Sequence, residues 1–279
     1  MDKQLLKFYI YFFVSLLLSI IIFSNLFLTH NNTIKYITTK LYNVNNYKPI
    51  EVNIYNSRSN VIIMMDDGWE SQYRIGYNYM EKYNIKGSIA VIPSHVGTTN
   101  YINKASLYFM YLNGWDLLNH TYSHYNLSKI NNKKQKKEIK KGMDWLKKNN
   151  FSNNNILIYP EGGYNQDVLN TMDELGIING RGTDEGFNPK NVPGSDTIKI
   201  KNVLSNINSN EVCNWIDKAI DNNLTLILLF HKLEQVTDKS LMQYDIGEFY
   251  KIIDYLYLNK DKLNIITYSD WIIGNRNKQ

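Results

Sequence analysis

Short apolar runs that alternate with helical patterns constrain the fold of this chain most strongly. The runs predicted as buried strands are Val61–Met65, Gly87–Ile92, Trp115–Leu118, Ile156–Tyr159, Gly176–Asn179, Ile198–Val203, Leu224–Phe230 and Leu263–Thr267. The helical patterns between them are Ser71–Tyr83, Lys104–Asn113, Lys133–Asn149, Gln166–Leu175, Asn210–Asn222 and Ile246–Leu258. Strands that alternate with helices favour a parallel sheet covered by helices. Seven or eight such units fit a β/α barrel better than a small open sheet.

An uncharged apolar stretch near the amino terminus predicts a membrane anchor. Phe8–Leu28 contains no charged residue, and as a helix it would span roughly 31 Å, about one hydrocarbon core. A cleaved signal peptide has a shorter apolar core and a cleavage site of small residues, which Ser24–Leu28 does not offer. We therefore expect an uncleaved anchor over residues 1–28, with a cleaved signal or a buried soluble helix as the alternatives.

The segments after this stretch predict the domain organisation. Residues 29–57 are polar and rich in Asn, Thr and Tyr, which is typical of a tether, and residues 58–279 carry the alternating pattern of one domain. Two lysines precede the apolar stretch and two follow it closely, so the charge asymmetry that orients a span is slight. Long trailing domains translocate largely regardless of such charges. We expect a single-pass protein of the cell membrane with the domain of residues 58–279 extracytoplasmic.

Composition excludes some classes of protein. With 43% hydrophobic residues the chain can bury a core, and its net charge of +5 is mild. No stacked-aromatic or basic recognition motif points to nucleic acid, so we expect no nucleic-acid partner. The single cysteine, Cys213, excludes an internal disulfide and lies in an apolar helical pattern.

Two carboxylates at the end of a predicted buried strand indicate chemistry. Asp66 and Asp67 follow Val61–Met65 directly. A buried charge is costly unless it is paired, metal-bound or protonated. A turn at Gly68 would let both side chains reach the end of the barrel. One carboxylate would then bind a metal while the other accepts a proton. The simpler alternative is that they cap a helix that starts near Trp69.

Three histidines also follow predicted strands. His120 and His124 come after Trp115–Leu118, and on one helical turn both imidazoles would face one cation. His231 ends Leu224–Phe230 and is suited to donate a proton near neutral pH. The alternatives are surface or capping histidines for the pair and a satisfied core histidine for the third. Because the carboxyl ends of barrel strands form one rim, we expect these side chains to meet the two aspartates there.

Two weaker features have simpler interpretations. His95 lies in a loop after another predicted strand and is a minor candidate for the same rim. The lysine run Lys133–Lys148 is most simply a solvated helix face, with contact to an anionic polymer or to membrane lipid as the alternative.

The motifs, in this order, resemble those of the polysaccharide deacetylases of carbohydrate esterase family 4. Met64-Met65-Asp66-Asp67-Gly68 resembles the motif T-F-D-D-G, and Leu228-Leu229-Phe230-His231 resembles the late motif L-x-H. His120-Thr121-Tyr122-Ser123-His124 matches H-[ST]-x-x-H. The resemblance extends over about residues 58 to 272. It implies a distorted β/α barrel of about seven parallel strands, and metal-dependent removal of N-acetyl or O-acetyl groups from a glycan.

The resemblance also implies a role for each matching residue. Asp66 resembles the general base, and Asp67, His120 and His124 resemble the three metal ligands. His231 resembles the general acid that protonates the departing amine. A water polarised by the cation would be deprotonated and attack the acetyl carbon.

The third and fourth motifs depart from the family pattern. The family's R-x-P-Y-G corresponds here to Ile158-Tyr159-Pro160-Glu161-Gly162, so the backbone N–H of Glu161 resembles the oxyanion donor. Ile158 replaces the arginine that braces the base, and Arg181 is our candidate substitute. Asp184 is our candidate for the aspartate that tunes the acid histidine.

We therefore expect a metal-dependent hydrolase that removes N-acetyl groups from a surface polysaccharide of the cell wall. Its partners would be an N-acetylated glycan and, through the apolar stretch, the membrane. Two imidazoles and a carboxylate suit zinc, and cobalt, nickel and iron also fit. The alternatives are an O-acetyl esterase with the same machinery and a glycan-binding pseudoenzyme. The intact set of base, acid and ligands argues against the pseudoenzyme, because binding alone needs neither a base nor an acid.

Overall fold

Parallel strands and the helices between them make up the described structure. The computed structural model describes residues 58–151, 155–192, 197–235 and 242–276. The strands are β1 (Ser59–Met65), β2 (Ser88–Val91), β3 (Asp116–Asn119), β4 (Ile156–Ile158), β5 (Asn179–Arg181), β6 (Lys201–Asn202), β7 (Thr225–Phe230), β8 (Lys232–Glu234), β9 (Gln243–Asp245) and β10 (Leu263–Ile265). The longer helices are α3 (Lys104–Leu112), α4 (Asn132–Lys148), α5 (Gln166–Leu175), α6 (Ser209–Asp221), α7 (Ile246–Leu258) and α8 (Tyr268–Arg276).

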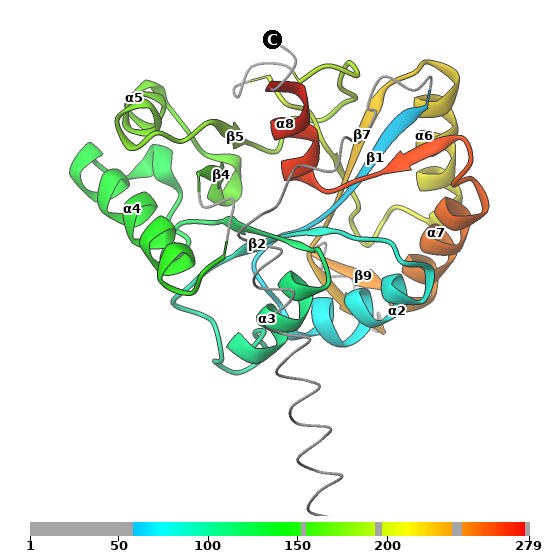
Figure 1. The fold of residues 1–279 in the computed structure, drawn as a ribbon, viewed down its shortest axis with the longest axis horizontal. Helices are drawn as coiled ribbons and strands as arrows, with labels where there is room; N and C mark the ends of the chain where they lie inside the picture. Colours follow the sequence, from blue (N-terminus) through cyan, green and yellow to red (C-terminus); the bar gives the residue numbers. More distant parts are fainter. Residues whose placement is uncertain (1–57, 152–154, 193–196, 236–241, 277–279) are drawn as a thin grey trace, which may run out of the picture. The chain divides into compact units, whose positions relative to one another are not determined.

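One parallel sheet contains eight of these strands (Figure 1). Its order is β5-β4-β3-β2-β1-β7-β6, and β10 pairs in parallel with the first part of β1, from Ser59 to Val61. The strand β2 pairs with the last residues of β1, Met64 and Met65, so β10 and β2 pair with successive parts of the same strand. The parallel α/β fold predicted from the sequence is confirmed.

The sheet curls without closing into a regular barrel. Among the described residues, β5 and β6 are the two ends of the strand order. The gap between them is crossed by an isolated bridge between Glu185 and Ile200, and Gly186 N–H donates to the Ile200 carbonyl at 2.8 Å. The predicted distorted barrel is thus an open, curled half-barrel.

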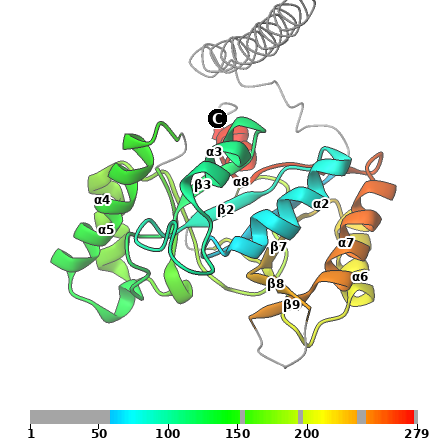
Figure 2. The same ribbon diagram turned by 90° about the horizontal axis from the view of Figure 1, so that it is seen from below.

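Alternation along β1 gives the sheet an outer and an inner face. Val61 and Ile63 belong to the larger core cluster, which contains side chains of α3, α6 and α7. Ile62 and Met64 belong to a second cluster inside the curl, which Trp271 of α8 helps to fill. Because successive strand residues point to opposite faces, the even-numbered residues of β1 lie inward. Figure 2 shows α4 beside α5 and α6 beside α7 on the outside of the sheet.

Some elements differ from the predicted ones. The predicted helix Ser71–Tyr83 is composite, with a π-helical turn over Gln72–Tyr77, then α2 (Asn78–Met80) and a 3₁₀ turn over Glu81–Tyr83. Strand β5 begins at Asn179, where the predicted run ended. Strands β8 and β9, which pair only with each other, and helix α8 were not predicted.

The predicted anchor over residues 1–28 and tether over 29–57 lie outside the described residues. In the part of the chain that is described, no helix has the length and apolarity needed to cross a bilayer.

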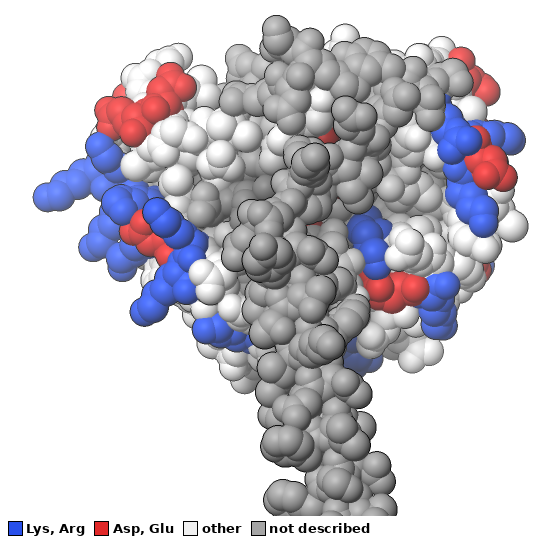
Figure 3. Space-filling view, in the orientation of Figure 1, with Lys and Arg blue, Asp and Glu red and all other residues white. Residues whose placement is uncertain are grey.

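The lysine run forms an exposed face of α4. In Figure 3 these side chains make up much of the basic surface on the left of the view. Lys136 pairs with Glu174 of α5, and Lys140 pairs with Asp144 one turn along the helix. The buried residues of α4, among them Ile139 and Leu146, face the core. A solvated helix face, as predicted, accounts for this pattern.

Candidate functional site

Strand alternation brings the candidate residues together at the carboxyl end of the sheet. Asp66 lies two residues after the inward-facing Met64, and His231 lies two residues after the inward-facing Leu229. His120 directly follows β3. Residues two apart on a strand share a face. These side chains therefore point into the top of the curl, where they are only 3%, 8% and 2% exposed, respectively.

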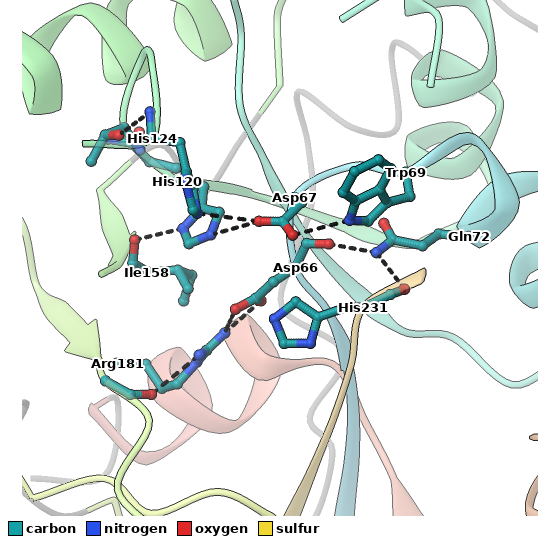
Figure 4. Close-up of polar contacts among 12 residues, drawn as sticks. Asp66, Asp67, Trp69, Gln72, His120, His124, Ile158, Arg181 and His231 are labelled. Carbon is teal, nitrogen blue, oxygen red and sulfur yellow. Dashed lines mark hydrogen bonds and ion pairs between the residues drawn. The ribbon is translucent and has the colours of Figure 1, made fainter. Parts of the chain in front are cut away.

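Asp67, His120 and His124 form a cluster with the composition of a metal site (Figure 4). One ligand atom from each lies within 4.8 Å of the others. Asp67 Oδ1 is 3.4 Å from His120 Nε2 and 3.2 Å from His124 Nε2. Burial alone would raise the pKa of Asp67, but hydrogen bonds from the two imidazoles outweigh it and hold that pKa well below its usual range. The carboxylate is ionised at neutral pH.

Asp67 leaves the strand through an unusual backbone conformation. Its φ is 79°, and Gly68 follows with a φ of 77°. Aspartate tolerates this left-handed region better than most residues do, and glycine adopts it freely. The turn carries the Asp67 carboxylate to the imidazoles instead of letting it alternate away from them. No helix cap is formed by Asp66 or Asp67, so the capping alternative is wrong.

The predicted helical turn from His120 to His124 is also wrong. These residues lie in an irregular loop after β3, and Thr121 and His124 each have a φ of 61°. The Thr121 hydroxyl accepts a hydrogen bond from His124 N–H at 3.1 Å. The buried Glu138 of α4 accepts another from Ser123 N–H at 2.8 Å. The two rings still converge, with centroids 4.7 Å apart, because these bonds fold the loop back on itself.

The residues fit a divalent cation. Two imidazoles and a carboxylate are ligands that zinc and neighbouring transition metals accept. His120 Nδ1 lies 2.8 Å from the carbonyl of Ile158, which orients the ring so that Nε2 faces Asp67. Metal-binding histidines usually hold their second ring nitrogen in this way. Ile158, which stands where the family has an arginine, therefore contributes its backbone to the cluster.

Arg181 lies against Asp66. One guanidinium nitrogen, Nη2, donates to both carboxylate oxygens, at 2.5 and 2.7 Å, and the Arg181 side chain is completely buried. Burial would raise the pKa of Asp66, but the charges of Arg181, His120 and His231 outweigh it and lower that pKa. A carboxylate with these neighbours stays ionised and can accept a proton. The contact is the one expected of a substitute for the missing arginine.

His231 is close to the two aspartates (Figure 4). Burial lowers its pKa, and the negative charges of Asp66 and Asp67 only partly compensate. Within the described residues, no hydrogen-bond partner lies against His231 Nδ1. Asp184, the candidate for that position, is instead paired with Lys199 at 3.2 Å and is mostly exposed. The structure thus brings Asp184 to Lys199 and not to His231.

Glu161 lies in the turn after β4. This 3₁₀ turn spans Pro160–Gly162, and Glu161 itself has a φ of 54°. The carboxylate of Glu161 accepts a hydrogen bond from Asn126 at 2.9 Å, in the loop that follows His124. The turn therefore places the Glu161 side chain against the loop that carries His124. Its backbone N–H donates to no backbone carbonyl of the described residues.

Sequence reasoning missed two residues of the site. The amide of Gln72 donates to the backbone carbonyls of Asp66 and of His231, the latter at 2.9 Å, and so joins the proposed base to the proposed acid. The indole N–H of Trp69 donates to Asp67 Oδ2 at 3.0 Å. Neither residue belongs to a motif that we recognised, although both follow the Asp-Asp pair closely.

Comparison with known proteins identifies relatives of this chain. Residues 54–179 match a family described as polysaccharide deacetylase. A poly-β-1,6-N-acetyl-D-glucosamine N-deacetylase from Staphylococcus epidermidis is 31% identical over 161 residues, which cover 53% of this chain and 55% of the relative. Its namesake from Staphylococcus aureus is 31% identical over 142 residues, which cover 46% and 49%. The chain spans about half the length of the curated relatives it matches.

Solved structures show the same fold. Peptidoglycan deacetylase PdaC from Bacillus subtilis aligns with a TM-score of 0.54 and 16% identity, covering 79% of this chain and 93% of its own. A family 4 acetyl xylan esterase from Clostridium thermocellum, solved with a cobalt ion, aligns with a TM-score of 0.53 and 16% identity over 77% of this chain and 91% of its own. At such identities the likeness concerns the fold alone.

Proposed function

We propose that this chain, which belongs to the polysaccharide deacetylase family, removes N-acetyl groups from a polymer of N-acetylglucosamine. The observation that carries the proposal is the convergence of an arginine-paired carboxylate, Asp66, with the cluster of Asp67, His120 and His124. The names of the curated relatives support the choice of polymer.

A divalent cation held by Asp67, His120 and His124 would supply positive charge that polarises the reacting groups. The chain's own residues would move the protons. Asp66 accepts a proton from water as the water oxygen bonds to the acetyl carbon. His231 donates a proton to the nitrogen as the C–N bond breaks, which releases acetate and an amine.

Three features of the site support these roles. The lowered pKa of Asp66 keeps the base ionised, and its pairing with Arg181 fixes its orientation. The lowered pKa of His231 makes it a readier proton donor once protonated. The N–H of Glu161, in the turn beside His124, is suited to stabilise negative charge on the acetyl oxygen.

The test is acetate release by the full chain in detergent. We would supply β-1,6-linked and β-1,4-linked N-acetylglucosamine oligomers and an O-acetylated xylan, with chelator and with Zn²⁺ or Co²⁺ restored. We expect release from an N-acetylated oligomer that stops with chelator and returns with metal. Release from the O-acetylated glycan alone would identify an esterase. No release by a folded, metal-loaded chain would contradict the proposed activity.

The apolar stretch Phe8–Leu28 supports the further proposal that the chain is anchored in the cell membrane with its catalytic domain outside. Fractionation of cells that express the chain tests this. Recovery in the membrane fraction, with the domain accessible to protease added outside, is the expected result. Recovery in the soluble fraction would contradict it.

A further inference from the structure

The two oxygens of Asp67 have different neighbours. Oδ1 lies 3.4 and 3.2 Å from the Nε2 atoms of His120 and His124. Oδ2 accepts a hydrogen bond from the indole N–H of Trp69 at 3.0 Å. Figure 4 shows Trp69 on the side of Asp67 away from His120. One oxygen is thus left for a cation that the imidazoles share, and the other is already engaged by the protein.

The indole of Trp69 is held by a neighbouring loop. Its ring stacks on Tyr101 with centroids 4.5 Å apart and planes inclined by 21°. The two residues also form an isolated antiparallel bridge. Ile102 N–H donates to the carbonyl of Gly68 at 2.9 Å. The loop that contains Tyr101 and Ile102 is therefore hydrogen-bonded to the turn on which Asp67 lies.

An indole N–H suits this task for chemical reasons. It can only donate, so it cannot compete with the carboxylate for a cation. A hydrogen bond to a ligating carboxylate fixes its orientation, and such outer partners are worth about 10- to 100-fold in metal affinity. The backbone of Asp67 lies in the sparsely populated left-handed region, which makes external support of its side chain more important.

We propose that Trp69 is a positioning residue for the metal site. By engaging Oδ2 it makes Asp67 present a single oxygen, Oδ1, to the cation, and the stack on Tyr101 holds the indole in place. This inference rests on the metal site of the proposed function but not on the identity of the substrate.

The experiment measures cation binding by the full chain in detergent. Co²⁺ is titrated and followed by its visible absorption spectrum, and Zn²⁺ affinity is obtained by competition. Trp69→Phe keeps an aromatic ring on Tyr101 and removes the donor. We expect it to bind both cations about 10- to 100-fold more weakly and to show an altered Co²⁺ spectrum. Trp69→Gln, which keeps an N–H donor without the ring, should recover part of the affinity.

The matched control is Trp115→Phe. The indole of Trp115 also donates to a carboxylate, Glu81 Oε1 at 3.1 Å, but it lies in the outer core cluster. The same substitution there should leave both the affinity and the Co²⁺ spectrum unchanged in protein whose unfolding transition remains cooperative.

The outcomes separate this inference from the proposed activity. Wild-type affinity in Trp69→Phe would overturn the inference, and so would an equal loss in Trp115→Phe, because the effect would then be general. A selective loss in Trp69→Phe would support it even if no glycan releases acetate, in which case only the proposed activity would fail.

Discussion

Two buried aspartates at opposite ends of the sheet have pKa values that are shifted in opposite directions. Asp66 follows β1 at the carboxyl end, and Asp116 begins β3 at the amino end. Both are nearly inaccessible, with 3% and 5% of their surface exposed. Burial and the charge of Asp270 raise the pKa of Asp116 to about 6. The charge of Arg181, together with those of His120 and His231, outweighs burial and lowers the pKa of Asp66.

The difference lies in the partners and not in the depth of burial. Asp116 accepts hydrogen bonds from the hydroxyls of Ser88 and Ser269 and from Ser269 N–H, which are all neutral donors. These hydrogen bonds lower the pKa of Asp116, but they do not outweigh burial and the negative charge of Asp270. Asp116 thereby ties α8 to the bottom of the sheet, a structural task that needs no charge. The proposed role of Asp66 as the base requires its carboxylate to remain charged, and the guanidinium of Arg181 lies directly against that carboxylate.

Replacing each carboxylate by its amide should separate the two tasks most clearly. We expect Asp66→Asn to lower kcat for deacetylation by about 10³-fold, since a positioned base contributes roughly 10²–10⁴-fold. The variant should keep its metal, because the ligands are untouched, and its remaining oxygen can still accept from Arg181. Asp116→Asn should keep wild-type kcat. Acetate release and bound metal, measured on both variants, provide the test. Full activity in Asp66→Asn would show that the assigned base is wrong.

Replacing Arg181, whose guanidinium pairs with Asp66, should lower the free energy of unfolding. Arg181→Met leaves a buried carboxylate without its partner, and breaking one side of a buried pair typically costs about 3–5 kcal/mol of unfolding free energy. In the Asp66→Asn background the same substitution should cost much less, because no charge is left unpaired. Urea unfolding of the two single variants and the double variant measures this coupling. Equal costs of Arg181→Met in both backgrounds would mean that the arginine acts only by filling space.

Local sequence patterns predicted the strands well and the contacts at their ends less well. Val61–Met65 and Leu224–Phe230 are continuous apolar runs, so their burial was readable from composition alone. Strand β8, Lys232–Glu234, has only Leu233 buried and pairs only with β9, so it left no such pattern. Helix α8 begins directly after the last predicted strand and has little amphipathic periodicity.

In the site, too, local patterns predicted which residues take part but not the contacts that hold them in place. Spacing suggested that His120 and His124 share a metal, but it also suggested a helical turn. The loop that replaces the turn depends on the hydrogen bond from Ser123 to Glu138, 15 residues further along the chain, which no local pattern reveals. Arg181 meets Asp66 across 115 residues of chain and was considered only because the family's arginine was absent. Long-range polar contacts of this kind depend on which strands are neighbours in the sheet, and local periodicity does not determine that order.

The contribution of Asp116, at the amino end of the sheet, to the free energy of unfolding should depend on pH. The raised pKa means that Asp116 binds a proton more tightly in the folded chain than in the unfolded chain. Its favourable contribution to the free energy of unfolding is therefore lost as pH rises from about 4 through about 6. The shift corresponds to roughly 3 kcal/mol. We expect Asp116→Asn, which does not titrate, to gain stability relative to wild type by up to that amount between pH 4 and pH 7. Urea unfolding across this range tests it, and a constant difference would show that Asp116 titrates normally.

An exposed ion pair can be compared with the buried pair of Arg181 and Asp66, and its loss should change the free energy of unfolding least. Lys136 Nζ lies 2.6 Å from Glu174 Oε2, about as close as the contact between Arg181 and Asp66, but both side chains are about half exposed. Water and salt screen such a pair, and its contribution is typically about 1 kcal/mol or less. We expect Glu174→Gln to change the unfolding free energy by no more than this. A loss comparable to that of Arg181→Met would mean that distance, and not burial, sets the strength of these pairs.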